Sequence, residues 1–228
     1  HMKKALIFLC LFSISLVAIS QRDGSLTVSI TYNGGIGKLN TGNSMVNSVF
    51  DNESLYNHGL ESRLIYTINR TWSISTGLEI NEYSEKVSVN EQRLFTPINV
   101  SPNASNDRRI FLDVENNLVL LGIPLRASYI FLNKDQFRVE FTGGFSAQFL
   151  IKSTSTSEDG SKENNEFNNK NLTLSWTVGL IASYRLTKVI SLQFGPNFSQ
   201  FVSEIDQSES LEYKPYKAAV QAGLALHL

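Results

Sequence analysis

Cysteine is nearly absent from this chain: the only one among its 228 residues is Cys10, within the first twenty positions. We expect that segment to be removed as an export signal, so the mature protein would contain no cysteine. Disulfides, thiol catalysis and thiolate metal sites are then excluded, and no lipid-modified cysteine is expected at the mature N-terminus.

The first twenty residues have the layout of a cleaved signal peptide. Lys3-Lys4, after what we take to be a cloning scar at residues 1–2, precede an apolar core from Ala5 to Ile19. That core is shorter than the about 20 apolar residues of a membrane-spanning helix. Ala18-Ile19-Ser20 provides the small-x-small pattern that signal peptidase reads, so we expect Gln21 to be the mature N-terminus.

An excess of charge of either sign is also missing. Lys and Arg number 20 against 21 Asp and Glu, a formal net charge of −1. This balance argues against nucleic-acid binding, which usually needs a basic surface. Residues 21–228 have a length that suits one domain. No apolar run after Ile19 is long enough for a membrane helix, but a membrane barrel needs none, because its strands alternate apolar and polar residues.

Alternation of this kind is the dominant pattern of the mature chain. From Phe137 to Ile151 nearly every second residue is apolar or aromatic, whereas the residues between them include Arg138, Glu140 and Gln148. Because successive side chains of a strand point to opposite faces, one face of this segment is apolar and the other is polar. The segment exceeds the about five to six residues of an average strand. It is long enough to cross a bilayer obliquely, which takes roughly 9–11 residues.

Seven further segments alternate in the same way, so we predict eight strands in all. The other seven lie at Leu26–Gly37, His58–Ile68, Trp72–Ile80, Val119–Phe131, Leu172–Leu186, Ile190–Ser199 and Tyr216–Leu228. Glycine pairs within two of the eight, Gly34-Gly35 and Gly143-Gly144, are predicted to be bend or bulge points of a curved sheet.

The connections between these strands alternate strictly between short and long. The short ones are Asn69–Thr71, Leu132–Gln136 and Thr187–Val189, and the long ones are about Lys38–Asn57, Ser84–Asn117, Lys152–Lys170 and Val202–Pro215. In an up-and-down barrel this order places every short turn at one rim and every long loop at the other. Outer-membrane barrels have short periplasmic turns and long external loops, and an even strand count then puts both termini on the periplasmic side.

Alternation alone does not decide which face points outward, since a soluble ligand-binding barrel would turn its apolar face inward. The loop asymmetry favours a membrane barrel. So does a polar face rich in Gly, Ser and Thr, which are small enough for a narrow lumen. Aromatic residues near strand ends suit interfacial girdles: Tyr66, Trp72, Tyr129, Phe131, Phe137, Trp176, Tyr184 and Tyr216. We therefore predict an all-β fold, an eight-stranded up-and-down antiparallel transmembrane β-barrel in a Gram-negative outer membrane, surrounded by lipid.

One segment of the fourth predicted strand resembles a known family. Leu121-Gly122-Ile123-Pro124-Leu125-Arg126, together with Gln21 after the cleavage site, is similar to the PorT-like outer-membrane β-barrel family of Bacteroidota. The resemblance covers Gln21 to Leu228 and implies a closed eight-stranded barrel, but no activity, because the roles of the family vary. The chain departs from many outer-membrane barrels at its end, Leu226-His227-Leu228, where an aromatic residue read by the assembly machinery is common.

Charged residues on the polar faces predict an ion network inside the barrel. Pairing the second and third strands about their short turn sets Glu61 opposite Glu79, with Arg63 diagonal to Glu79. Two facing carboxylates repel each other unless a cation intervenes. Pairing the fourth and fifth strands sets Arg126 diagonal to Glu140. The predicted lumenal charge network, of which the last two residues lie nearer the periplasmic rim, consists of Glu61, Arg63, Glu79, Arg126, Glu140, Arg138 and Arg185.

The network leaves more than one function open. It could plug the barrel or gate a narrow porin-like channel, and the plug is favoured because eight strands leave little room for solute. Paired carboxylates also serve glycosidases as acid and base, but a filled lumen does not suit a substrate. A surface hydrolase could use His58 with Asp51 and Ser54 in the loops, although no nucleophile motif flanks them.

Motifs for cofactors and metals are absent from the sequence. There is no glycine-rich phosphate loop, no His-Glu-x-x-His and no calcium loop, and His227 has no neighbouring metal ligands in the sequence. We therefore predict no catalytic residue, no cofactor and no metal. The expected role is that of a non-enzymatic structural, accessory or interaction component that displays four external loops. Its candidate partner is another outer-membrane protein or complex.

Overall fold

A computed structural model of the protein describes residues 25–41, 50–89, 114–157, 162–164, 172–202 and 213–228. The predicted signal peptide lies outside these residues. The described part contains ten strands: β1 (Ser25–Thr41), β2 (Phe50–Ser54), β3 (Tyr56–Thr67), β4 (Trp72–Val89), β5 (Val114–Lys134), β6 (Phe137–Ser157), β7 (Lys162–Asn164), β8 (Leu172–Arg185), β9 (Ile190–Phe201) and β10 (Tyr213–His227). A helix long and apolar enough to cross a membrane does not occur among the described residues.

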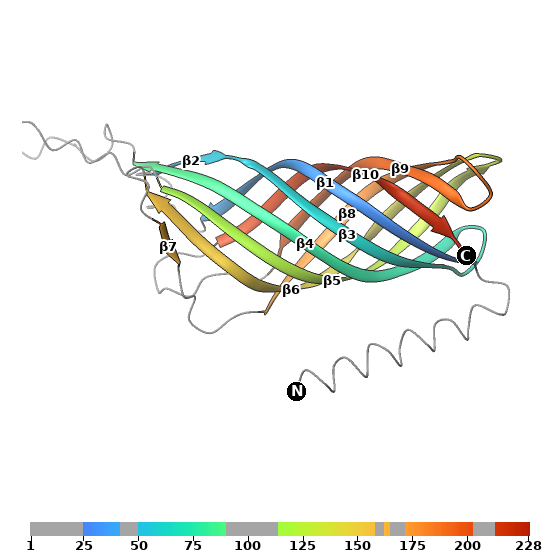
Figure 1. The fold of residues 1–228 in the computed structure, drawn as a ribbon, viewed down its shortest axis with the longest axis horizontal. Coiled ribbons are helices and arrows are strands. Elements are labelled where there is room, and N and C mark those ends of the chain that lie inside the picture. The colour runs from blue at the N-terminus through green and yellow to red at the C-terminus, as the bar shows by residue number, and fades with distance from the viewer. Residues whose placement is uncertain (1–24, 42–49, 90–113, 158–161, 165–171, 203–212) are drawn as a thin grey trace, which may run out of the picture.

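Eight long strands form a closed antiparallel barrel (Figure 1). The order around the barrel is β1, β3, β4, β5, β6, β8, β9 and β10, and β10 pairs with β1 to close it. The two short strands only extend the wall, β2 beside β4 and β7 beside β6. Closure removes the free edges that an open sheet would present. The predicted eight-stranded up-and-down barrel is confirmed.

The two ends of the barrel differ. The three short connections, β3–β4, β5–β6 and β8–β9, all lie at one end, where β1 also begins and β10 ends (Figure 1). We call this the turn end, and the opposite end the loop end. Side chains shape the turns: Asn69 Oδ1 accepts hydrogen bonds from the backbone N–H groups of Thr71 and Trp72, both at 2.8 Å. Asp135 takes a φ of 40° in the two-residue β5–β6 turn.

Several strands are longer at the loop end than the sequence predicts. β4 continues to Val89, β5 begins at Val114 and β6 continues to Ser157, where long loops are expected from the sequence. The reason lies in composition. These extensions carry polar residues at most positions, such as Glu115-Asn116-Asn117 and Ser153-Thr154-Ser155, so the alternation that marks a strand is lost although the backbone pairing persists.

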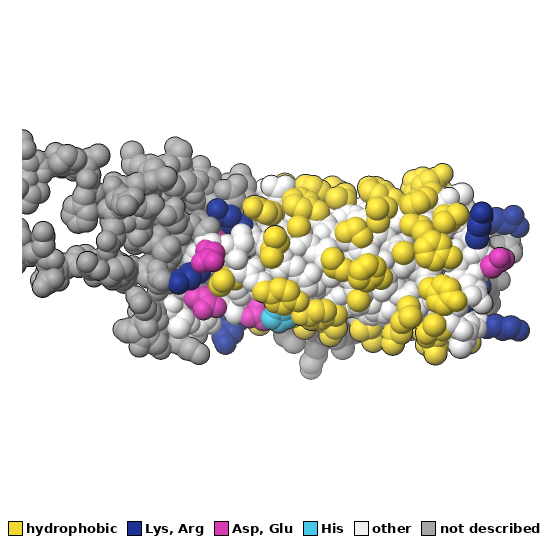
Figure 2. All heavy atoms as spheres, turned by 90° about the horizontal axis from the view of Figure 1, so that it is seen from above, with side chains coloured by type: hydrophobic (Ala, Val, Ile, Leu, Met, Phe, Trp, Pro, Cys, Tyr) yellow, Lys and Arg dark blue, Asp and Glu magenta, His cyan; other side chains and the backbone are white. Residues whose placement is uncertain are grey.

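Side chains alternate between an apolar outer wall and a polar lumen. Large apolar side chains point outward, among them Leu125 at 67% exposed and Phe145 at 59%. Small polar ones such as Thr31 and Ser175 are buried inside. Figure 2 shows the apolar side chains as a broad band between two ends that carry charges. Soluble monomers rarely expose apolar surface on this scale. The predicted outward orientation of the apolar face is confirmed.

Two of the three prolines in the described strands, Pro124 and Pro196, lie at gaps in the hydrogen-bond ladders, whereas Pro215 is paired with Leu39. In the β4–β5 ladder the residue pairs at Ile123 and Pro124 are missing, and in the β8–β9 ladder those at Gly195 and Pro196 are missing. Proline has no N–H to donate to a neighbouring strand. The register is the same on both sides of each gap, so the wall tolerates the proline without a bulge.

Neither of the two glycine pairs predicted as bend or bulge points forms a bulge. Pairing runs through Gly34-Gly35 and through Gly143-Gly144 without a register shift. The shifts lie instead between β5 and β6, at Val119/Leu120 and at Ile130/Leu132.

Candidate functional site in the barrel lumen

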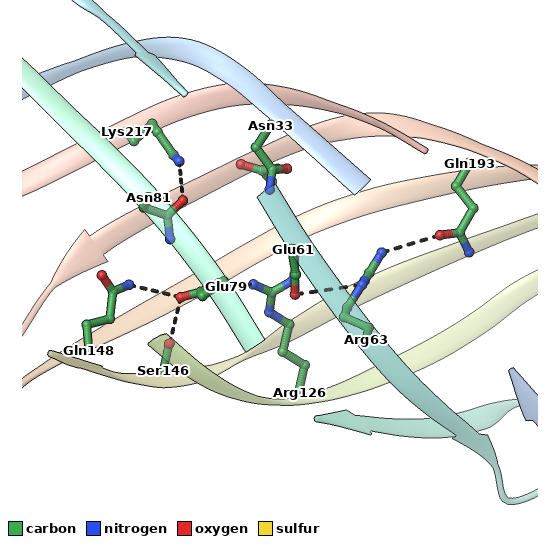
Figure 3. Close-up of polar contacts among 11 residues, drawn as sticks. Asn33, Glu61, Arg63, Glu79, Asn81, Arg126, Ser146, Gln148, Gln193 and Lys217 are labelled. Carbon is green, nitrogen blue, oxygen red and sulfur yellow. Dashed lines mark hydrogen bonds and ion pairs between the residues drawn. The ribbon is translucent and has the colours of Figure 1, made fainter. Parts of the chain in front are cut away.

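Two carboxylates and one guanidinium meet in the middle of the lumen (Figure 3). Glu61 on β3 faces Glu79 on β4, as the short turn between these strands predicts. Arg126 on β5 lies between them, with Nη1 at 2.8 Å from Glu61 Oε1 and Nη2 at 3.1 Å from Glu79 Oε2. All three residues are buried, Arg126 at 7% exposed. We call these three residues the central ion cluster.

Neutral side chains complete the contacts of Glu79. Ser146 Oγ donates to Glu79 Oε1 at 2.6 Å, and Gln148 Nε2 donates to the same oxygen at 3.0 Å. Both donors come from β6. The Glu79 carboxylate on β4 is therefore bonded by side chains of β5 and β6. Buried charges require such partners.

A second arginine lies on the turn-end side of the cluster. Arg63 Nε is 3.7 Å from Glu61 Oε1, too far for a hydrogen bond but close enough for an ion pair. Its Nη2 donates to Gln193 Oε1 across the lumen at 3.4 Å. Arg63 thus extends the contacts of the cluster to β9.

A buried lysine lies on the other side, towards the loop end. Lys217 Nζ on β10 donates to Asn81 Oδ1 at 2.8 Å and lies 5.3 Å from the centre of the Tyr83 ring. The middle of the lumen therefore contains three cations, Lys217 and the two arginines, against the two carboxylates of the cluster.

Beyond the lysine an apolar cluster lies in the lumen. Tyr83 and Phe201 meet edge to face, with ring centres 5.5 Å apart, and pack with Leu118 and Leu120. All four are buried, and Leu150 packs against them. We call this cluster of five residues the apolar cap. It lies between the ion cluster and the loop end, where a polar lumen would otherwise admit water.

The turn end of the lumen is open and holds a cavity of about 460 Å³, which we call the vestibule. Its side chains are mostly polar. Arg138 donates to Glu140 from both Nε and Nη2, with Nε at 3.0 Å. His227 bridges two strands, since Nδ1 is 3.1 Å from Thr27 Oγ1 and Nε2 is 2.7 Å from Ser191 Oγ.

The predicted charge network therefore divides into two groups. Four of its residues lie in the middle of the lumen, and Glu140, Arg138 and Arg185 line the vestibule. The predicted diagonal contact between Arg126 and Glu140 is wrong, because Arg126 faces Gly144 and Glu140 faces Ile130. The connection expected to span five residues is a two-residue turn preceded by a bulge at Ile130/Leu132, which shifts the register of β5 against β6.

Sequence reasoning missed several residues of the lumen. The alternation places Lys217, Gln193 and Gln148 on polar faces, but it gives no information about which of them share a level inside the barrel. Tyr83 lies beyond the predicted strand, which ends at Ile80, and the buried Glu85 lies in the segment expected to be a loop. Among the described residues no group of three or more His, Cys, Asp and Glu could hold a metal ion.

The residues proposed for a surface hydrolase are not arranged around His58. The His58 side chain lies on the outer wall, where Nε2 is 3.2 Å from Glu82 Oε2 and the ring stacks beside Tyr32 and Tyr56. Asp51 and Ser54 lie on β2, which precedes β3 along the same edge of β4, seven and four residues before His58. The histidine is therefore bonded to a carboxylate on the wall of the barrel.

Glycines face the long charged side chains of the lumen. Gly122 lies opposite Glu79 and Gly144 lies opposite Arg126. A Cβ on Gly122 would come within 2.7 Å of Glu79 Cγ, and one on Gly144 within 2.1 Å of the Leu125 carbonyl oxygen. The narrow lumen holds the ion cluster because the neighbouring strands carry no side chain at these positions.

Comparison with known proteins gives likenesses of fold. No family model matches the chain, and no curated protein matches it. Neisserial surface protein A is 13% identical, with 87% of this chain and 96% of that chain covered and a TM-score of 0.47. The outer membrane protein OprG from Pseudomonas aeruginosa is 11% identical, with 88% and 95% covered and a TM-score of 0.44. The N-terminal β-barrel domain of OprF from the same organism is 10% identical, with 90% and 100% covered and a TM-score of 0.40. No function follows from likenesses this distant.

We expect removal of the central cation to destabilise the barrel strongly. The substitution Arg126→Met leaves the buried Glu79 opposite Glu61 without the cation that lies between them, which should cost about 3–5 kcal/mol. Urea-induced unfolding in lipid vesicles measures the free energy. The double variant Arg126→Met/Glu79→Gln removes one charge of each sign, keeps Glu61 beside Arg63, and should recover most of the loss. Equal destabilisation of the single and double variants would contradict the assignment of Arg126 as the counter-ion of Glu79.

Adjacent glycines on opposite faces of β6 provide a matched pair. Gly144→Ala should destabilise the barrel by about 1–3 kcal/mol, because the new methyl group clashes with the backbone of β5. Gly143→Ala should be neutral or slightly stabilising, since its Cβ would be 3.7 Å from the nearest atom. The same unfolding measurement compares the two, and a loss of equal size at Gly143 would contradict the packing argument.

Proposed function

We propose that this chain is an outer-membrane β-barrel protein without enzymatic activity, and that it acts as a structural, accessory or interaction component. The observation that carries this proposal is the closed barrel with an apolar outer wall and a polar, ion-paired lumen. Only helices and closed barrels satisfy every backbone hydrogen bond within a bilayer. Lipid is then the partner of the wall.

The distribution of turns supports one orientation in the membrane. Outer-membrane barrels have short turns in the periplasm and long loops outside, so we assign the turn end to the periplasm. Residues Ser25 and Leu228 would then lie on the periplasmic side. The pair His58–Glu82, with Tyr32 and Tyr56, would mark the external membrane interface, where amphipathic rings are common.

The contents of the lumen support a barrel that does not conduct ions. The central ion cluster fills the middle, and the apolar cap closes the space between the cluster and the loop end. The protein would therefore act through its external strands and loops or through its lipid-facing wall. Its candidate partner is another outer-membrane protein, and copurification from native outer membranes would identify it.

A gated, porin-like channel is the second candidate. One observation favours it: the vestibule already opens the turn-end part of the lumen, so only the ion cluster and the apolar cap separate the two sides. Apolar constrictions can gate pores by excluding water.

Membership of the PorT-like family of Bacteroidota also remains a proposal. It is supported by the segment Leu121–Arg126, which supplies both Arg126 of the ion cluster and the buried Pro124 at the gap in the β4–β5 ladder. A structure of a purified member of that family, in which the same arginine bonds to two carboxylates, would strengthen the assignment.

If the outer wall lies in a membrane, the folding free energy lost on substitution to lysine should depend on the depth of the position in the bilayer. Leu125→Lys, in the middle of the apolar band, should cost about 2–4 kcal/mol of folding free energy in lipid vesicles. Ile36→Lys, at the level of Tyr56 near the proposed interface, should cost about 0–1 kcal/mol. Both positions are exposed, so a water-soluble barrel would accept lysine at either one, and equal small effects would contradict the proposal.

Planar-bilayer conductance distinguishes a plug from a gate. For a plug, Glu79→Ala and Arg126→Ala should raise single-channel conductance no more than a surface substitution such as Lys188→Ala, because the apolar cap still blocks the lumen. A large increase in either lumenal variant, but not in Lys188→Ala, would favour the gated channel over the plug.

A further inference from the structure

The turn end carries a ring of basic residues. Arg70 and Lys188 lie within two of the short connections, and Lys134 is the last residue of β5, next to the third. Arg138 and Arg185 lie just inside the rim. The acidic residues near them in the described part of the chain are Asp135 and Glu140. Figure 2 shows basic side chains projecting at this end beyond the apolar band.

Three of these basic residues line the vestibule, but only one of them is neutralised there. Arg138 is bonded to Glu140, the buried carboxylate of the cavity. Arg70 and Arg185 also line the cavity, and neither has an ion-pair partner among the residues that the structure describes. Asp135 at the rim offsets one of the two charges. The cavity therefore presents two guanidinium groups at its mouth with at most one carboxylate to balance them.

The rest of the vestibule suits a polar ligand. Its lining includes the hydroxyl groups of Ser183 and Thr67 and the amides of Asn133 and Gln193, which offer both donors and acceptors. The volume of about 460 Å³ falls in the range of small-molecule sites, roughly 300–1,000 Å³. The inner end is closed by Arg63 and the central ion cluster, so a ligand that enters from the turn end has no way through.

We propose that the vestibule is a binding site for a small oxyanion-bearing ligand, one that carries carboxylate or phosphate groups, and that this ligand enters from the turn end. Guanidinium groups bind both kinds of oxyanion with two parallel hydrogen bonds, and they are more weakly hydrated than ammonium groups. Arg185 and Arg70 bind the anionic group, and the hydroxyls and amides bind the neutral part. The site itself does not depend on a membrane, whereas the assignment of its mouth to the periplasm rests on the proposed function.

Calorimetric titration of the full chain in micelles of an uncharged detergent tests the site. Citrate and glucose 6-phosphate serve as the carboxylate and phosphate probes, and glucose is the uncharged control. We expect saturable binding of at least one anionic probe and none of glucose. Arg185→Gln should weaken that binding at least about tenfold, the loss expected for a charge-assisted hydrogen bond. Thr67→Trp, which fills the cavity from its rim, should abolish it.

Lys188→Gln is the matched control, because it removes one charge from the same rim at a residue that does not line the cavity. The affinity of this variant for the anionic probe should stay within about twofold of that of the unchanged chain, since exposed charges at a distance are screened by salt. Equal losses for Arg185→Gln and Lys188→Gln would overturn the vestibule site in favour of diffuse attraction to the rim. The absence of saturable binding for both anionic probes would also overturn it.

Failure of the vestibule site can be distinguished from failure of the membrane assignment. If the chain fractionated away from membranes while the titration still gave Arg185-dependent binding, the site would stand and the membrane assignment would fail. If Leu125→Lys and Ile36→Lys showed the expected dependence on depth but no probe bound, the membrane assignment would stand and the vestibule site would fail.

Discussion

The interaction on which the interior of this barrel depends is the bond of Arg126 to both Glu61 and Glu79. Closure of eight strands sets a narrow lumen, and the pairing of β3 with β4 brings two carboxylates face to face inside it. Without a cation, this pairing would be unfavourable. One guanidinium from the next strand bonds to both groups, and Arg63 adds a second positive charge beside Glu61. A contact made across β3, β4 and β5 therefore stabilises the register of all three. Buried ion pairs of this kind stabilise a fold weakly in themselves, but they are costly to break.

Space for this cluster comes from the neighbouring backbone. Gly122 and Gly144 face Glu79 and Arg126, and a methyl group at either position would collide with atoms of the cluster or of the adjacent strand. The limited space also explains why the rest of the lumen consists mainly of Ser, Thr, Asn and Gln. On the outer wall no such restriction applies, and large apolar side chains occupy the positions between. The alternation of polar and apolar residues along each strand therefore places polar side chains in the lumen and apolar side chains on the outer wall.

The sequence was sufficient to predict the architecture, because each feature that defines it has a period or a length. Alternation marks the eight strands, and alternating short and long connections give their order. The opposition of Glu61 and Glu79 follows from a three-residue turn. The contact of Arg126 was assigned to the wrong carboxylate because a bulge at Ile130/Leu132 and a shorter turn shift the register. Lys217 and Gln193 were not placed, since the level at which residues of distant strands meet depends on the stagger of the whole barrel.

The lumen is not symmetric along its axis, and this asymmetry bears on where the protein can act. At the loop end, Tyr83 and Phe201 close the interior with apolar contacts, and strands such as β4 and β5 continue beyond the apolar band with polar residues on both faces. At the turn end the interior is open, polar and lined by arginines. The two ends therefore differ in chemistry: the wall extends beyond the apolar band at one end, and a polar cavity opens at the other. The central ion cluster and the apolar cap lie between these two ends.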